Sequence, residues 1–422
     1  MGRDDSLTQK PELDGFSREY ARLSFDIERH VPGFIDAYLG PDNIRAALDP
    51  EDPAGALPMP AALVTAARNL LAKIPSLDTS EGRKGYLTKQ VEAMLTNARR
   101  VAGEEIPYRE EVRLLFDIEP KATPEGIYDA AISDLDALLP GDGPIAERMV
   151  AWRQSYVVPP ETARRLVDVI LPELRARTQE LVNLPEDESI EIRMVQDQPW
   201  SGYNWYLGSG RSRVDLNTDL PIYAYRLTDL LAHEGYPGHH TEHALKERLY
   251  TEQGLGEHAL QLINTPECLI SEGIATVAEK MLFTPHELVR FRRDRVYPAA
   301  GIAGDPEREV AIGAAQRILR SVPGNAALLL HEEGRDPQDV VAYLQRYGLV
   351  AEGEARQRLR FIADPLWRAY IFTYHVGYEL ISGWLDQAPA ERHGRFRTLL
   401  TEQVYPSQIA AWTASGAGPL PA

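Results

Sequence analysis

The sequence predicts a mainly α-helical protein with one small antiparallel β-sheet, and two patterns lead to this fold class. Apolar residues recur at three- and four-residue spacings through most of the 422 residues, as in helices that bury one face. Only the region 190–218 differs, because its short segments alternate in polarity or carry aromatic and β-branched residues between turn residues. The chain is long enough to bury a large core, as one domain or two closely joined ones.

The helices follow from this periodicity in order along the chain. In 16–31 the residues Phe, Tyr, Leu, Phe and Ile fall on one face. Thr123-Pro124-Glu125 places a capping residue before a proline, and Thr284-Pro285-His286-Glu287 has the pattern of a capping box. Further helices are predicted over 61–75, 84–102, 123–139, 160–182, 271–283, 307–320, 337–347 and 366–387.

Three predicted strands, 190–195, 201–208 and 212–218, form the small sheet. They lie immediately before the stretch HEGYPGHH, which occupies residues 233–240. Because the turns between these strands are short, we expect the three strands to pair antiparallel. The sheet is therefore expected beside the helix that begins the candidate site.

Composition disfavours several classes of function. The chain has 63 acidic and 45 basic residues and a net charge of -18, which repels phosphate backbones and anionic lipids. We therefore expect neither a nucleic-acid partner nor a membrane partner. The segment 1–15 lacks the apolar centre of a secretory signal, and no segment approaches 18 uninterrupted apolar residues. The single cysteine, Cys268, excludes an internal disulfide, and the cytoplasm is the expected compartment.

The stretch HEGYPGHH carries candidate metal ligands. A hydrolytic zinc site needs three protein ligands, an open position and a carboxylate that accepts a proton from water. His233 and Glu234 end an apolar helical run, so they can supply a ligand and this general base. Downstream, a helical pattern places Glu272 and Glu279 seven residues apart, hence on one face. Glu272 is the candidate for the ligand that follows on a second helix.

The second histidine ligand requires a broken helix, because Pro237 stands four residues after His233. In a regular helix His239 would lie about 240° around the axis and His240 about 10 Å along it. A proline followed by a glycine disrupts helical hydrogen bonding and permits unusual dihedral angles. We predict a bulge at 236–238 that returns His239 or His240 toward His233, and we favour His239, which needs the smaller insertion.

HEGYPGHH, followed by SEGIATVAE at 271–279, resembles the bacterial proteins grouped as domain of unknown function 885. Those proteins carry H-E-x-x-P-G-H-H and a later segment close to E-G-W-A-L-Y-A-E. The similarity runs from about residue 195 to the C-terminus, with Ile274 and Val277 where the family usually has Trp and Tyr. The family is placed with zincin-like metallopeptidases, so the resemblance implies a helical, gluzin-like fold and one zinc ion per chain.

The resemblance also implies roles for matching residues. The implied metal ligands are His233, Glu272 and one of His239 and His240, the other histidine lying behind the site. Glu234 would be the general base, and Glu279 would orient a ligand histidine. His243 is expected to pack or cap.

Two later segments extend the resemblance. LLLHEEGRDPQDVVAYL (328–344) is similar to a family segment with a histidine, so His331 is expected in the cleft. TYHVGYELI (373–381) resembles the family's Tyr-x-x-Gly helix, which makes Tyr374 a candidate hydrogen-bond donor to the oxyanion. The Pro-Gly-Gln that usually precedes this tyrosine is absent here.

These patterns predict a zinc-dependent hydrolase of amide bonds, most simply of peptide bonds, with peptides or small amides as substrates. The strand 212–218 is expected to pair with an extended substrate, and Arg211, Arg213 and Arg368 are candidate clamps for a substrate carboxylate. One alternative is a metal hydrolase of a non-peptide amide or ester. Another is a non-catalytic helical scaffold with a vestigial metal site, although Glu234 is not needed in a purely structural site.

The expected organisation is one compact, two-lobed unit without repeats or a low-complexity linker. The expected parts are a loose N-terminus (1–12), a helical part (13–189), a metallohydrolase part (190–414) and a loose tail (415–422). The oligomeric state is not predicted.

Overall fold

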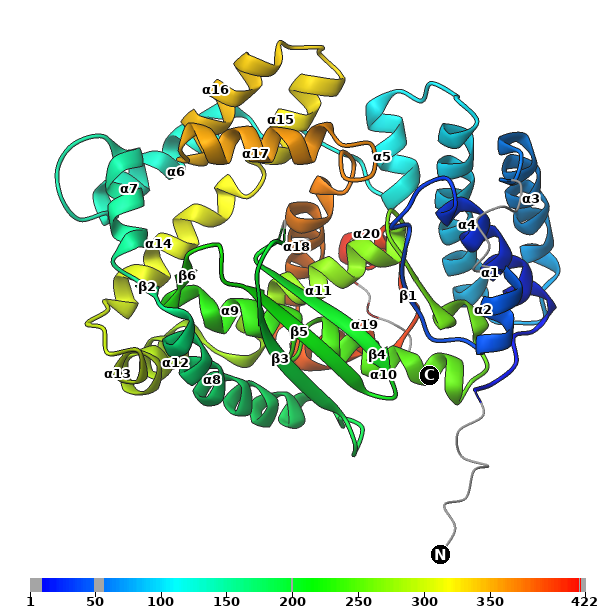
Figure 1. Cartoon of the computed structure of the whole chain (residues 1–422), viewed down its shortest axis with the longest axis horizontal. Helices are drawn as coiled ribbons and strands as arrows, with labels where there is room; N and C mark the ends of the chain where they lie inside the picture. Colours follow the sequence, from blue (N-terminus) through cyan, green and yellow to red (C-terminus); the bar gives the residue numbers. More distant parts are fainter. Residues whose placement is uncertain (1–9, 49–56, 199, 417, 419–422) are drawn as a thin grey trace, which may run out of the picture.

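The computed structural model of this chain describes residues 10–48, 57–198, 200–416 and 418. In these residues the protein is mainly helical and has small β-sheets, which confirms the predicted fold class (Figure 1). The predicted loose ends lie largely outside the described residues. No helix in the described parts of the chain is long and apolar enough to cross a membrane.

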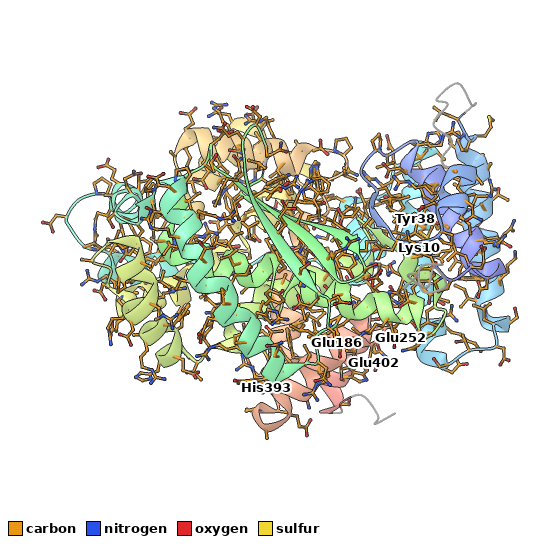
Figure 2. All side chains as sticks on the ribbon, turned by 60° about the horizontal axis from the view of Figure 1, so that its bottom comes forward. Lys10, Tyr38, Glu186, Glu252, His393 and Glu402 are labelled. Atoms are coloured by element: carbon orange, nitrogen blue, oxygen red, sulfur yellow. The ribbon has the colours of Figure 1, made fainter. Side chains whose placement is uncertain are left out.

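Four helices form one end of the molecule, at the right of Figure 1. Their hydrophobic core also takes in Leu260 and Leu262 from a distant strand, so the two regions fold together. Figure 2 shows Lys10 and Tyr38 at this end of the molecule. The four helices are α1 (Gly15–Glu28), α2 (Asp42–Leu48), α3 (Pro60–Lys73) and α4 (Glu81–Val101).

The other helices surround a second, larger hydrophobic core. This core contains residues from both sides of the predicted boundary at residue 190. The division of the chain at that residue therefore stays a prediction. The helices are α5 (Tyr108–Phe116), α6 (Glu125–Leu138), α7 (Ile145–Gln154), α8 (Pro160–Leu181), α9 (Ala224–Glu234), α10 (His239–Thr251), α11 (Pro266–Leu282), α12 (Pro285–Phe291), α13 (Tyr297–Ala300), α14 (Pro306–Leu319), α15 (Val322–His331), α16 (Pro337–Gly348), α17 (Glu352–Ala363), α18 (Ile371–Asp386), α19 (Arg392–Thr401) and α20 (Pro406–Ser415).

Every predicted helical range overlaps one of these helices, and the ends agree to within five residues. The capping box at Thr284 is confirmed, because its side chain accepts from the Glu287 N–H and Glu287 reaches back to the Thr284 N–H. Thr123 does not cap α6. The helix begins after Pro124, and the Thr123 N–H donates instead to Asn325 Oδ1 at 2.9 Å.

The predicted sheet is present, but it is mixed rather than antiparallel. Its strands are β3 (Ser189–Val195), β4 (Gly202–Gly208) and β5 (Arg211–Asn217), in the order β3-β5-β4. β4 pairs antiparallel with β5 as expected, whereas β3 pairs parallel with β5 because the connection 196–201 carries the chain past the end of β5. β5 is therefore the central strand and cannot pair with a substrate, which corrects that expectation.

Two further antiparallel pairs consist of short strands that periodicity did not predict. β1 (Ile35–Tyr38) pairs with β7 (Leu260–Leu262), and β2 (Val157–Val158) pairs with β6 (Ile222–Tyr223). The first pair joins the α1–α4 end to the rest of the molecule.

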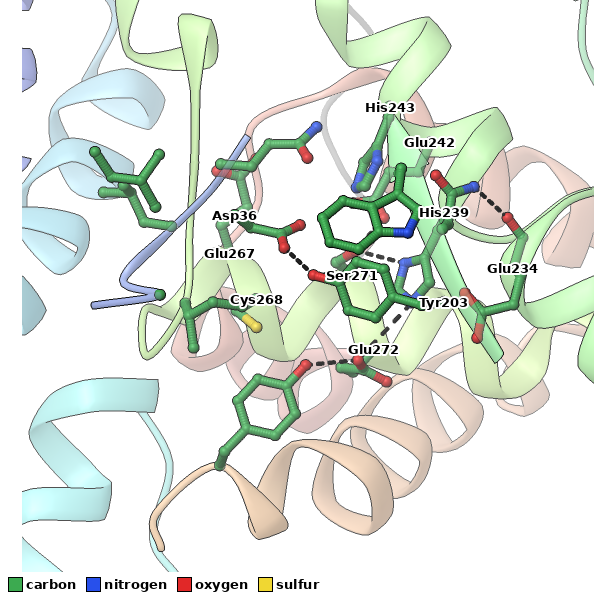
Figure 3. Close-up of a pocket in the computed structure, with 18 of the residues that line it drawn as sticks. Asp36, Tyr203, Glu234, His239, Glu242, His243, Glu267, Cys268, Ser271 and Glu272 are labelled. Atoms are coloured by element: carbon green, nitrogen blue, oxygen red, sulfur yellow. Dashed lines mark hydrogen bonds and ion pairs between the residues drawn. The ribbon is translucent and has the colours of Figure 1, made fainter. Parts of the chain in front are cut away.

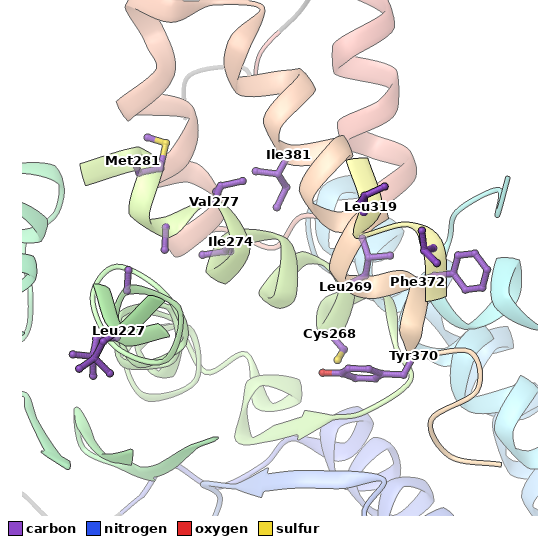
Figure 4. Close-up of a cluster of buried hydrophobic side chains, with 14 of the residues drawn as sticks. Leu227, Cys268, Leu269, Ile274, Val277, Met281, Leu319, Tyr370, Phe372 and Ile381 are labelled. Atoms are coloured by element: carbon purple, nitrogen blue, oxygen red, sulfur yellow. The ribbon is translucent and has the colours of Figure 1, made fainter. Parts of the chain in front are cut away.

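Helices α11 and α18 lie side by side, with Leu269, Ile274 and Ile381 among the apolar side chains around them (Figure 4). They approach closely at two glycines. A Cβ on Gly273 would lie 2.8 Å from the Gly377 carbonyl oxygen, and one on Gly377 would lie 2.8 Å from the Leu269 carbonyl oxygen. These distances are too short for any larger residue, so the two glycines allow the helices to cross.

Candidate metal centre and cavity

The stretch HEGYPGHH is a helix break. α9 ends at Glu234 and α10 begins at His239. In between, the chain turns through a cis Tyr236–Pro237 peptide bond, and the Gly238 N–H donates to the Ala232 carbonyl at 3.0 Å. The irregularity predicted at 236–238 is thus confirmed in place, although it separates two helices instead of forming a bulge within one.

Gly238 is required at this break. A Cβ at this position would lie 1.9 Å from the carbonyl oxygen of His233 and 2.5 Å from that of Ala232. Because both contacts are with backbone atoms, no rotamer change can relieve them. The glycine therefore permits the close return of the chain that brings His239 beside His233.

Three of the predicted ligand side chains meet around one point. His233 Nε2 lies 3.5 Å from Glu272 Oε2, and His239 Nε2 lies 3.8 Å from Glu272 Oε1. The rings of His233 and His239 are 4.8 Å apart and nearly perpendicular, at 89°. One donor atom from each residue falls within 4.8 Å of the others. Figure 3 shows His239, Glu272 and Glu234 facing a common space.

This donor set fits a zinc ion. Zinc ligands bound at about 2.0–2.2 Å in a tetrahedron stand about 3.3–3.6 Å apart, close to the two distances from Glu272. Glu272 is buried, and its Oε2 has no hydrogen-bond partner among the described residues. Burial holds the pKa of His233 well below its usual range, which leaves the neutral imidazole that binds metals. A cation would satisfy the unpaired carboxylate oxygen.

Residues behind the ligands fix their orientation. His239 Nδ1 lies 3.1 Å from Ser271 Oγ, and that hydroxyl donates to Glu242 Oε2 at 2.6 Å. The Tyr370 hydroxyl donates to Glu272 Oε1 at 2.7 Å. Sequence reasoning missed Ser271, Glu242 and Tyr370, although Tyr370 lies one helical turn before the predicted Tyr374 and that spacing is a usable signal.

Glu234 lies in the same cavity as His233, His239 and Glu272, which we call the ligand group. Its side chain is buried at the edge of the ligand group, and the Asn204 side-chain amide donates to its backbone carbonyl at 2.5 Å. Burial raises the pKa of Glu234 to about 7; His239 opposes this, and the negative charge of Glu272 adds to it. A carboxylate with this pKa can both accept and release a proton near neutral pH.

Tyr374 lines the same cavity as Glu234 and Glu272. Burial raises the pKa of Tyr374 well above its usual range, and the nearby Glu272 adds to the effect. Its hydroxyl therefore keeps its proton and remains a hydrogen-bond donor. Tyr374 thus lies at the cavity, and its role as hydrogen-bond donor to the oxyanion stays a prediction.

His240 and His331 have other surroundings. His240 is fully buried, with Nδ1 2.9 Å from Ser212 Oγ and Nε2 2.9 Å from Glu188 Oε2. Both of its nitrogens thus have partners away from the ligand group. His331 is not brought to the cavity, because its Nε2 lies 2.6 Å from the Ile362 carbonyl oxygen and its ring packs on Tyr108.

Glu279 does not reach a ligand histidine. Its carboxylate accepts from Arg292 at 2.9 Å. Burial raises the pKa of Glu279 to about 7 although Arg292 opposes this. The seven-residue spacing puts Glu279 on the face of α11 that carries Glu272, but two turns further along the helix. There its hydrogen-bond partner is Arg292, from the segment that follows α12.

The proposed arginine clamps are engaged elsewhere. Arg213 donates to Asp215 at 3.0 Å and stacks over Trp205. Arg368 forms an ion pair with the fully buried Glu111. Arg211, Arg213 and Arg368 are not among the described residues that line the cavity.

A cavity of about 540 Å³ opens in front of the ligand group. On one side its wall is β4, the edge strand of the mixed sheet. The lining is rich in aromatic side chains: Trp200, Tyr203, Trp205, Phe361, Trp367, Tyr370 and Tyr374. A cavity of this size and lining suits a small organic ligand or a short peptide.

Comparison with known proteins gives similarity in fold. No family model and no curated protein match the chain. Among solved structures, a candidate lipoprotein from Colwellia psychrerythraea has a TM-score of 0.55 at 18% identity, covering 84% of this chain and 66% of that chain. This chain thus spans slightly less than two thirds of the Colwellia protein, and the similarity shows the fold alone.

Two further structures are more distant. A candidate lipoprotein of unknown function from Shewanella oneidensis has a TM-score of 0.49 at 15% identity, covering 84% of this chain and 72% of that one. An M32 carboxypeptidase from Deinococcus radiodurans R1 has a TM-score of 0.41 at 12% identity, covering 96% and 95%. The resemblance to domain of unknown function 885 and the cytoplasmic compartment stay predictions.

Proposed function

We propose that this protein is a zinc-dependent hydrolase that cleaves amide bonds, with peptides as its simplest substrates. The observation that carries the proposal is the meeting of His233, His239 and Glu272 around one point, with the buried Glu234 beside them. A structural zinc site needs no such base, and it does not need a cavity of about 540 Å³ in front of it.

His233, His239 and Glu272 would hold the zinc ion, which when bound polarises a carbonyl group and increases the acidity of water. Glu234 then accepts a proton from the attacking water on its carboxylate and delivers it to the nitrogen of the leaving amine. The Tyr374 hydroxyl donates a hydrogen bond to the substrate oxygen as negative charge develops on it.

The edge strand β4 is the surface on which an extended substrate would lie. Residues 202–205 of β4 line the cavity, whereas β5 is already paired on both sides. Main-chain hydrogen bonds to an edge strand hold a peptide without fixing its side chains. Aromatic side chains along the cavity would then contact the substrate.

The mechanism is tested by Glu234→Gln. The variant should bind zinc in the same ratio as the natural protein, measured by elemental analysis of protein purified without a histidine tag. Hydrolysis of a peptide library, followed by mass spectrometry, should fall by a factor on the order of 10²–10⁴, the usual contribution of a positioned acid–base group.

The control is Glu279→Gln, which makes the same chemical change on the face of α11 that binds Arg292. This variant should keep its peptide turnover. Full turnover in Glu234→Gln would contradict the mechanism. Cleavage of acylated small molecules but of no peptide would favour a non-peptide amide or ester substrate, and absence of zinc uptake would favour a scaffold.

A further inference from the structure

The lining of the cavity is acidic. Among the described residues that line it, one lysine, Lys246, stands against six carboxylates. Two of these are Glu272, which belongs to the ligand group, and Glu234, which lies beside it. The remaining four are Asp36, Glu242, Glu247 and Glu267.

Three of the four remaining carboxylates are engaged by the protein. Lys246 Nζ lies 2.7 Å from Glu242 and 3.5 Å from Glu267, so its positive charge is shared between them. Glu247 accepts from the Tyr206 hydroxyl at 2.6 Å and from backbone N–H groups of the β4–β5 turn. Neither the lysine nor these carboxylates is free to bind a ligand.

Asp36 is different. It lies at the irregular point of β1, where the register with β7 shifts between Ile35 and Ala37, and bulges of this kind redirect side chains beside functional sites. Figure 3 shows Asp36 and Tyr203 pointing toward one another in the cavity. The Tyr203 hydroxyl donates to one oxygen, but Asp36 forms no ion pair with any described residue.

Three aromatic hydrogen-bond donors of the cavity already have protein acceptors. The Tyr203 hydroxyl donates to Asp36, the Tyr370 hydroxyl donates to Glu272, and the indole N–H of Trp205 donates to Asp215 at 2.9 Å. Asp36 still offers a carboxylate acceptor, so a ligand that brings a hydrogen-bond donor to this part of the lining fits it best. The ring of Tyr203, whose hydroxyl binds Asp36, also favours a nearby positive charge.

We propose that Asp36 binds a protonated primary amine of the substrate, so that this protein selects substrates with a free amino group near the bond that is cleaved. A substrate carboxylate would instead meet the carboxylate of Asp36. The amine can be the α-amino group of a peptide or the side chain of a lysine, which share the same chemistry. The selection of a substrate rests on the proposed function, whereas the binding of an amine at Asp36 does not depend on it.

The test is calorimetric binding at pH 7 to zinc-loaded Glu234→Gln protein. The probes are leucinamide, which has a free α-amine, N-acetyl-lysinamide, which has a side-chain amine, and N-acetyl-leucinamide, which has neither. At least one of the two amines should bind about tenfold or more tightly than N-acetyl-leucinamide, because a partly buried charge pair has that strength or more. Which amine binds identifies the source of the cation.

Asp36→Asn in the same background should remove this preference. Glu247→Gln, which removes another cavity carboxylate that is satisfied by Tyr206, should keep it. A preference that survives Asp36→Asn would mean that the amine binds the zinc ion, and would overturn the inference. Equal binding of all three probes, or binding of none, would also overturn it, even if Asp36→Asn did not fold.

These outcomes are independent of hydrolysis. Absence of cleavage of both peptides and acylated small molecules by the natural protein contradicts the proposed function, whereas the amine preference is measured in a variant without the general base. The two proposals can therefore fail separately.

Discussion

His239 and His240 are neighbours in the chain, but their surroundings are unrelated. His239 faces Glu272 and the cavity, while His240 is fully buried between Ser212 and Glu188. Glu188 also accepts from Arg175 at 2.6 Å, so a positive charge compensates the buried carboxylate. Hydrogen bonds to His240, Tyr236 and Arg175 lower the pKa of Glu188 although burial opposes them. This network anchors the start of α10 and leaves His239 free for the ligand group.

At the same scale, Ser271→Ala should weaken zinc binding without unfolding the protein. The Ser271 hydroxyl lies between His239 Nδ1 and Glu242 and so fixes the ring orientation. Loss of such a partner lowers metal affinity by about 10–100-fold. Competition with a chromophoric chelator measures the zinc affinity. Thr276→Ala is the control, because its hydroxyl donates to the backbone carbonyl of Glu272 in its own helix; equal zinc affinities in the two variants would show that Ser271 does not position His239.

At the scale of elements, the crossing of α11 and α18 joins two parts of the site. Glu272 and Gly273 are adjacent on α11, and Tyr374 lies three residues before Gly377 on α18. The glycine contact therefore sets how far Tyr374 and Tyr370 stand from Glu272. The sequence pattern contains both glycines, but their contact depends on how the helices pack.

Gly377→Ala should destabilise this crossing. The added methyl group would meet the Leu269 carbonyl oxygen at 2.8 Å and the Gly273 Cα at 3.1 Å, and overpacking of this kind costs about 1–3 kcal/mol. Thermal unfolding should show a lower Tm, and peptide turnover should fall as Tyr374 moves. Gly383→Ala, on the same helix with no atom within 4 Å of the added Cβ, should be neutral or stabilising. Equal Tm values for both variants would exclude this role for the glycine pair.

Much of the secondary structure follows from the sequence, because helical periodicity is a local property. The predicted ranges 84–102 and 160–182 correspond to α4 and α8 within a few residues. The parallel pairing of β3 with β5 did not follow, because strand direction depends on which side of β5 the chain passes. Short elements such as β1 and β7 have too few residues to show a period.

At the scale of the whole molecule, His375 makes stability depend on pH. It lies on α18 with 6% of its side chain exposed, close to Gly324 of α15. Burial lowers the pKa of His375 to about 4, compared with about 6.5 in an unfolded chain. Between these values the unfolded state binds a proton and the folded state does not. This contribution is therefore absent above pH 6.5, and it destabilises the fold increasingly as the pH falls toward 4.

His375→Gln should flatten that dependence. The loss of unfolding free energy between pH 7 and pH 4 should be smaller in the variant by up to about 3 kcal/mol, at about 1.4 kcal/mol per pKa unit. Urea titrations at several pH values measure this difference. His286→Gln, at an exposed position, should match the natural protein. Parallel pH profiles for natural protein and His375→Gln would contradict the prediction.

The sequence by itself determined the helices, the position of the break at 236–238 and one candidate site formed by His233, Glu234 and Glu272 with either His239 or His240. These features depend on local periodicity and on the local effects of proline and glycine. Only the tertiary structure decided which side chains meet across long separations: Asp36 with Tyr203, Tyr370 with Glu272, and Arg368 with Glu111. Such pairings depend on how helices and strands pack, and no spacing along the chain encodes them.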